Sequence, residues 1–94
     1  MAQVWSDEDI GSRLQGLDWK REGDNIVRDW KFKDFAEAMA FVNGVAEAAE
    51  EANHHPDILL HGWNKVRLSL MTHSEGGLTD NDFDMARRFD DLTG

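Results

Sequence analysis

The first third of the chain shows apolar residues at helical spacing, followed by two strand-like segments. Ser6 precedes an acidic residue by three positions, as in a capping box, and Ile10 begins an apolar stripe, which predicts a short helix over residues 7–15. Residues 19–22 and 26–33 are typical of strands that flank a turn-forming Gly-Asp-Asn group, so we expect a β-hairpin. The apolar face of its second strand consists of Ile26, Trp30 and Phe32, with Arg28 between them.

A long helix is the clearest pattern in the chain. Asp34, followed three residues later by a glutamate, begins it, and Asn53 and Pro56 mark its end, because proline disfavours a helical conformation in the residue before it. The helix therefore delivers His54 and His55 to its own C-terminus. Its predicted inward stripe consists of Phe35, Ala38, Met39, Val42, Val45, Ala46, Ala49 and Ala52.

Apolar and polar residues alternate over residues 63–72, which is the pattern of a strand buried on one face. Residues 57–61 form a candidate edge strand just before it. The pair Gly76-Gly77 ends the alternation, and Thr79 with Asp82 begins a third helix. The predicted inward stripe of that helix consists of Met85, Ala86, Phe89 and Leu92.

These elements follow the order α-β-β-α-β-α. That order predicts an α+β fold, in which one antiparallel sheet of about four strands, counting the candidate edge strand, carries three helices on one face. A chain of 94 residues encloses only one modest core. We therefore expect residues 1–94 to form a single domain.

The composition narrows the classes of function. The chain has 19 acidic and 10 basic residues and a formal charge of −9, which argues against direct nucleic-acid binding, because Lys and Arg drive contacts with phosphates. No apolar run approaches the roughly 20 residues of a membrane-spanning helix. The start of the chain does not resemble a signal peptide, so we expect a cytoplasmic protein with no membrane partner. Cysteine is absent, which leaves oxygen and imidazole groups for any chemistry.

The main candidates for chemistry are the four histidines, His54, His55, His61 and His73, because imidazole exchanges protons near neutral pH. If the long helix persists to His54, Glu50 lies at i, i+4 and can hydrogen-bond that ring. The plainer interpretation is that a histidine at a helix end caps the helix or lies on the surface.

Two further residues have both a structural and a functional interpretation. Asp82 completes the capping box of the third helix, but it also falls on the inward stripe, where a carboxylate needs a partner such as a histidine. His73 continues the strand pattern on the side away from the core, beside a flexible glycine pair. Trp63 lies too far along a straight strand to share a pocket with His73, so we expect it to be structural or to contact another subunit.

A metal centre is not expected. Neighbouring His54 and His55 cannot readily ligate one ion from a regular element, and no two histidines stand at i, i+4 on a helix. The sequence also has no glycine motif for nucleotide phosphates and no nucleophile elbow.

The segments Glu50–Asp57, Trp63–Val66 and Thr72–Thr79, together with Asp82, resemble the signature of the pterin-4a-carbinolamine dehydratase family. They combine an acidic residue four positions before the first histidine, a His-His-Pro triplet, an aromatic residue, a Thr-His pair and a later aspartate, in the family's order. The similarity extends upstream to Trp19 and covers nearly the whole chain.

The resemblance implies a role for each matching residue. The catalytic group would be His54, His73 and His55, of which the first two transfer protons and the third holds the pterin. The substrate would be bound by Asn53, His54, His55, Met71, Thr72, His73, Ser74 and the flat apolar face of Trp19. Glu50 and Asp82 would orient and tune the histidines.

The implied reaction is the dehydration of 4a-hydroxytetrahydropterin to quinonoid dihydropterin, a lyase reaction that supports pterin recycling and needs no cofactor, since no electron is transferred. Family members are homodimers or homotetramers. Self-association also fits the apolar run Ile58–Leu60 beside a sheet edge. Animal members also assist dimerisation of a homeodomain transcription factor, and other relatives assist assembly of Rubisco or its carboxysome. A non-catalytic binding or assembly factor of the same fold is therefore the alternative.

Overall fold

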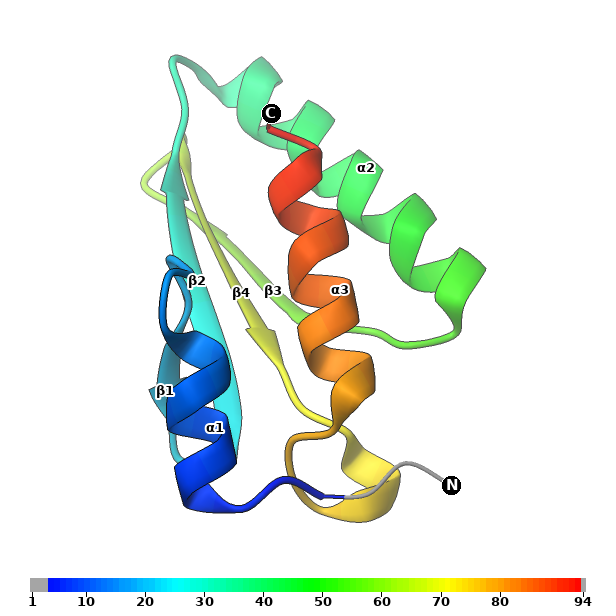
Figure 1. The fold of residues 1–94 in the computed structure, drawn as a ribbon. Coiled ribbons are helices and arrows are strands. Elements are labelled where there is room, and N and C mark those ends of the chain that lie inside the picture. Colours follow the sequence, from blue (N-terminus) through cyan, green and yellow to red (C-terminus); the bar gives the residue numbers. More distant parts are fainter. Residues whose placement is uncertain (1–3, 94) are drawn as a thin grey trace.

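The structure, a computed structural model, describes residues 4–93. A single four-stranded antiparallel sheet has the strand order β1-β2-β4-β3, so β2 and β4 are central. Helices α2 and α3 lie side by side over one face of this sheet, and α1 lies beside β1 (Figure 1). In chain order the elements are α1 (Asp7–Leu14), β1 (Lys20–Glu22), β2 (Asn25–Lys31), α2 (Phe35–Ala52), β3 (Asp57–His61), β4 (Lys65–Leu70), the 3-10 turn η1 (His73–Glu75) and α3 (Asp80–Asp91).

The α+β class and the sheet predicted from the sequence are confirmed, and the candidate edge strand is real. The element order is therefore α-β-β-α-β-β-α. The strand expected over residues 63–72 is shorter at both ends, because β4 spans Lys65–Leu70. It begins after Gly62 and Trp63, whose positive φ angles of 54° and 60° form a turn. It ends before Thr72, which instead forms an isolated bridge with Gly77.

One core lies between the helices and the sheet. Alternate residues of β2 and β4 face the helices, so Ile26, Val66, Leu68 and Leu70 are fully buried. Aromatic rings extend this core along β2, where the Trp30 ring centroid lies 4.7 Å from that of Phe41 in α2. The helices contribute Ile10 from α1, Ala38, Phe41, Val45 and Ala48 from α2, and Phe83, Met85, Ala86 and Phe89 from α3.

The buried stripe of α2 differs in part from the prediction. Ala38, Val45 and Ala49 are buried as expected, whereas Phe35 and Met39 are 53% and 36% exposed. Residues Ala46 and Ala52 are exposed too, and Phe41 and Ala48, which were not assigned to the stripe, are buried. Because α2 is apolar on most of its sides, helical spacing alone cannot select the side that packs. In α3 the prediction was wrong for Leu92, which is 45% exposed, and it missed Phe83, which is buried.

Arg28 faces the helices although it is charged, and Asp90 of α3 explains why. The guanidinium Nη1 of Arg28 lies 2.5 Å from Asp90 Oδ1, and the Cζ of Arg28 lies 4.4 Å from the centroid of the Trp30 ring. The indole Nε1 of Trp19 donates to the same Asp90 oxygen over 2.9 Å. This contact joins β2 to α3 and gives the half-buried charge of Arg28 a partner.

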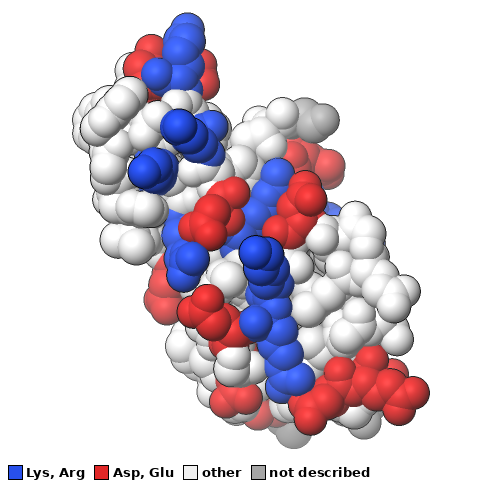
Figure 2. Space-filling view, turned by 90° about the vertical axis from the view of Figure 1, so that its left-hand side faces the viewer, with Lys and Arg blue, Asp and Glu red and all other residues white. Residues whose placement is uncertain are grey.

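Charged side chains of both signs lie on the side of the molecule away from α2 and α3 (Figure 2). Lys and Arg groups alternate there with Asp and Glu groups (Figure 2). Arg67 of β4 holds Asp29 of β2 through two hydrogen bonds of 2.9 and 3.1 Å. These bonds keep the pKa of the Asp29 carboxyl below its usual range. Among the helices that the structure describes, none has the length and apolarity needed to span a membrane.

Candidate functional site

The end of α2 turns His54 towards α3. Asn53 caps the helix in the left-handed conformation, with a φ of 51°, and its backbone N–H donates to the carbonyls of Ala49 and Glu50. The backbone N–H of His54 also donates to the Ala49 carbonyl over 3.1 Å. Asparagine tolerates this conformation better than most residues, because its side chain is short and polar. The chain therefore leaves the helix axis at Asn53, and the His54 ring no longer follows the helical spacing.

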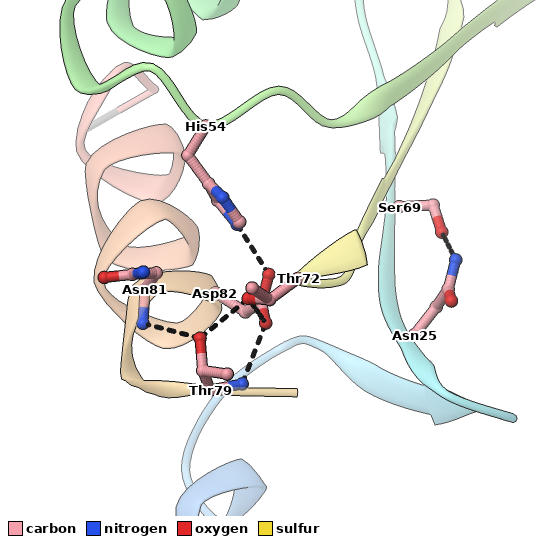
Figure 3. A network of polar contacts seen from close by, with 7 residues as sticks. All are labelled: Asn25, His54, Ser69, Thr72, Thr79, Asn81 and Asp82. Carbon is pink, nitrogen blue, oxygen red and sulfur yellow. Dashed lines mark hydrogen bonds and ion pairs between the residues drawn. The ribbon is translucent and has the colours of Figure 1, made fainter. Parts of the chain in front are cut away.

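The start of α3 supplies the partner of His54. Asp82 is the third residue of α3 and completes a capping box with Thr79, whose backbone N–H donates to Asp82 Oδ2 over 2.9 Å. The other oxygen, Oδ1, lies 2.7 Å from His54 Nε2, and Thr72 Oγ1 donates to Oδ2 over 2.8 Å (Figure 3). Asp82 is fully buried. Three segments far apart in the sequence thus meet at one carboxylate.

His54 is positioned so that one ring nitrogen is bonded and the other remains available. Its side chain is 14% exposed, and it borders a hollow of about 280 Å³ whose lining also includes Asn53, Asn81, Asp84 and Arg88. A histidine that is held by a buried carboxylate and reached from a hollow is suited to giving and taking a proton.

His55 and Glu50 form a second histidine-carboxylate pair on the surface. His55 Nε2 is hydrogen-bonded to Glu50 Oε2, and both side chains are exposed. The expectation that Glu50 pairs with His54 at i, i+4 was therefore wrong. The left-handed Asn53 directs His54 to α3, so the next histidine takes the carboxylate of Glu50 instead.

His73 lies in the loop between β4 and α3. The strand pattern does not continue to it, because β4 ends at Leu70 and His73 is the first residue of η1. His73 and Ser74 are exposed, and Met71 is half-buried. Within the part of the chain that the structure describes, the His73 side chain makes no hydrogen bond with another residue. The loop is nevertheless tied to His54, because Thr72 precedes His73 and donates to Asp82.

Two residues that were expected to contact the substrate are buried, and their polar groups bond other residues. Trp19 is 2% exposed and lies in the core, with its ring edge-on to Trp30 at 5.7 Å, so it offers no face to a ligand. Thr72 is 6% exposed, and its hydroxyl bonds Asp82 and Thr79. In contrast, Trp63 is 61% exposed, which contradicts a structural role in the core. His61 is exposed on β3, opposite Lys65.

Sequence reasoning missed the α3 residues that line the hollow beside His54. Asn81, Asp84 and Arg88 recur at i, i+3 and i+7 and so lie along one side of the helix. That spacing was available in the sequence, but these residues were not among the predicted site residues. As for metals, no three His, Asp or Glu side chains within residues 4–93 converge to hold an ion.

Comparisons with known proteins show the family to which the chain is similar. The model of the family described as pterin 4 alpha carbinolamine dehydratase matches residues 3–92. A protein of Thermomicrobium roseum that carries the provisional name pterin-4-alpha-carbinolamine dehydratase is 53% identical over 92% of each chain. The crystal structure of a transcriptional coactivator/pterin dehydratase from Brucella melitensis matches with a TM-score of 0.91 and 33% identity, over 98% of this chain and all of that one.

A second solved structure shows how the fold is used elsewhere. It is described as a pterin dehydratase-like protein that is a RuBisCO assembly factor in the alpha-carboxysome. It matches with a TM-score of 0.70 and 26% identity, over 84% of this chain and 93% of that one. The full-length match to the family model and the identity to named relatives lead to one conclusion: the chain belongs to the pterin-4a-carbinolamine dehydratase family.

Proposed function

We propose that this protein dehydrates a 4a-hydroxytetrahydropterin to the quinonoid dihydropterin. The observation that carries the proposal is the His54–Asp82 pair at the edge of a hollow, in a chain of this family. The pair supplies an imidazole whose orientation is fixed, which is what proton transfer at a bound ligand requires. The alternative, a purely structural histidine, would not need an accessible ring nitrogen.

The reaction balances with imidazole groups alone. One protonated imidazole gives its proton to the 4a-hydroxyl, the C4a–O bond breaks, and water leaves with the bonding electron pair. A neutral imidazole accepts the proton of N5, and the N5 electron pair forms the new double bond to C4a. We assign these two proton transfers to His54 and His73, and we assign His55, held by Glu50, to binding the pterin together with Asn53, Met71 and Ser74. No electron is exchanged with a cofactor, so we propose catalysis without metal or nucleotide.

Turnover without metal tests this proposal. We expect purified protein in buffer with a chelator to accelerate the dehydration of a 4a-hydroxytetrahydropterin that is generated in situ and followed by absorbance. The reason is that the residues assigned to proton transfer belong to the chain itself. Activity that appears only after zinc is added would contradict the metal-free mechanism.

The second candidate function is that of a binding or assembly factor. The match to the RuBisCO assembly factor and the exposed side chains of Phe35 and Met39 on α2 favour it. An exposed apolar stripe on a helix is suited to contact with another protein. Absence of turnover in correctly folded protein would select this function over catalysis.

We also propose that the chain self-associates, in a dimer or tetramer, through the sheet edge at β3. Ile58 and Leu59 of this edge strand are 40% and 53% exposed. An open edge with apolar side chains favours pairing with a second chain.

We expect sedimentation velocity at micromolar concentration to show an oligomer. Leu59→Lys should shift it towards the monomer, whereas Ser12→Lys, the same charge change on α1, should not. A monomeric wild-type protein would contradict the proposal.

A further inference from the structure

The buried hydrogen bonds around Asp82 determine where each hydroxyl proton lies. Asp82 accepts from His54 Nε2 on one oxygen, and from Thr72 Oγ1 and the Thr79 backbone N–H on the other. An ionised carboxylate can only accept hydrogen bonds. Thr72 has therefore used its single proton, and the 2.7 Å contact between the hydroxyls of Thr72 and Thr79 must carry the proton of Thr79.

The same logic fixes the tautomer of neutral His54. Because both oxygens of Asp82 are acceptors, the proton in the 2.7 Å contact belongs to His54 Nε2. The unprotonated nitrogen is then Nδ1, which bonds no residue that the structure describes. Nδ1 is not a buried atom either, because the one buried side-chain polar atom that lacks a partner in the described residues is Trp30 Nε1. Nδ1 is thus the nitrogen that a ligand can reach.

We infer that His54 presents Nδ1 as its reacting nitrogen and that Thr72 is the positioning residue that fixes this arrangement through Asp82. Thr72 is 6% exposed and its hydroxyl is bonded to Asp82 and Thr79, so we do not assign it to substrate binding. Its hydroxyl holds the Asp82 plane so that Oδ1 points at His54 (Figure 3). The catalytic part of this inference rests on the proposed dehydratase function, whereas the tautomer does not.

Nuclear magnetic resonance of ¹⁵N-labelled protein tests the tautomer without any substrate. At a pH where the ring is neutral, we expect the His54 signals of a protonated Nε2 and an unprotonated Nδ1. The opposite tautomer would overturn the inference, even in an active enzyme. If the expected tautomer is found in a protein without turnover, the dehydratase proposal fails while the assignment of Nδ1 stands.

Kinetics of Thr72 variants test the positioning role. Thr72→Val keeps the size of the side chain but removes the donor to Asp82, so we expect kcat to fall roughly tenfold with KM unchanged. Thr72→Ser restores the donor and should recover most of kcat. Ser69→Ala is the matched control, because it removes a hydroxyl that is bonded to Asn25 over 2.7 Å in the same sheet, away from His54. An equal loss of kcat in Ser69→Ala, or a loss that appears in KM, would overturn the role of Thr72.

Discussion

Replacing His54 with alanine should slow dehydration by roughly 10²-fold or more, the contribution that a general acid or base makes to catalysis. The structure places this ring against a buried carboxylate and beside a hollow, so its loss removes an oriented proton carrier. The fold should persist, because His54 lies after the last residue of α2 and outside the core. Steady-state rates at neutral pH, together with circular dichroism, measure both expectations.

His73→Ala should cause a loss of similar size, since the proposed reaction needs a second proton-transfer group. The matched control is His61→Ala. His61 is also an exposed histidine, but it lies on the edge strand β3, opposite Lys65, and its replacement should leave the rate nearly unchanged. If all three variants kept the wild-type rate, the proposed site would have to be abandoned.

The second large effect is on stability. Asp82→Ala should lower the free energy of unfolding by about 3 kcal/mol, because it removes a helix cap and leaves several buried donors without an acceptor. These donors are the hydroxyl of Thr72, the backbone N–H of Thr79 and Nε2 of His54. Urea unfolding followed by circular dichroism gives the value.

Two other variants show whether burial of the carboxylate is the cause. Asp84→Ala changes an exposed aspartate of the same helix and should alter the free energy of unfolding by less than about 0.5 kcal/mol. Asp82→Asn keeps the size of the side chain and one acceptor, so its cost should fall between the two. Equal stability of the Asp82 and Asp84 alanine variants would show that the polar contacts around Asp82 add little to the fold.

The sequence was sufficient to predict most of the secondary-structure elements and part of the candidate site. Alternation and helical spacing identified the three α-helices and three of the strands, and residues 57–61 were a candidate for the fourth. The position of Asp82 on an inward stripe correctly indicated a buried carboxylate with a histidine as partner. The histidine could not be chosen from spacing, because the left-handed Asn53 breaks the helical register between Glu50 and His54. A single backbone dihedral thus decided which histidine faces α3.

Trp19 and His73 show two other limits of sequence reasoning. The resemblance suggested a ligand contact for Trp19, but the indole N–H of Trp19 donates to Asp90. Asp90 lies far away in the sequence, so spacing along the chain could not indicate this bond. His73 was predicted to lie on a continuing strand. The alternation of apolar and polar residues does not show at which residue the backbone pairing of two strands ends. In the structure, β4 ends at Leu70, two residues before the predicted end, and Thr72 forms only an isolated bridge with Gly77.

The double use of Asp82 changes how relatives of this protein should be sorted into enzymes and non-enzymes. Asp82 completes the capping box of α3 as well as holding His54, so we expect a lineage that abandons catalysis to keep an aspartate there for the stability of the helix. His54 makes no comparable contribution to the core and is free to change once turnover is no longer selected. Under the proposed function, the presence of this aspartate in a related sequence would report only the fold, whereas the histidine at the end of the long helix would report the activity.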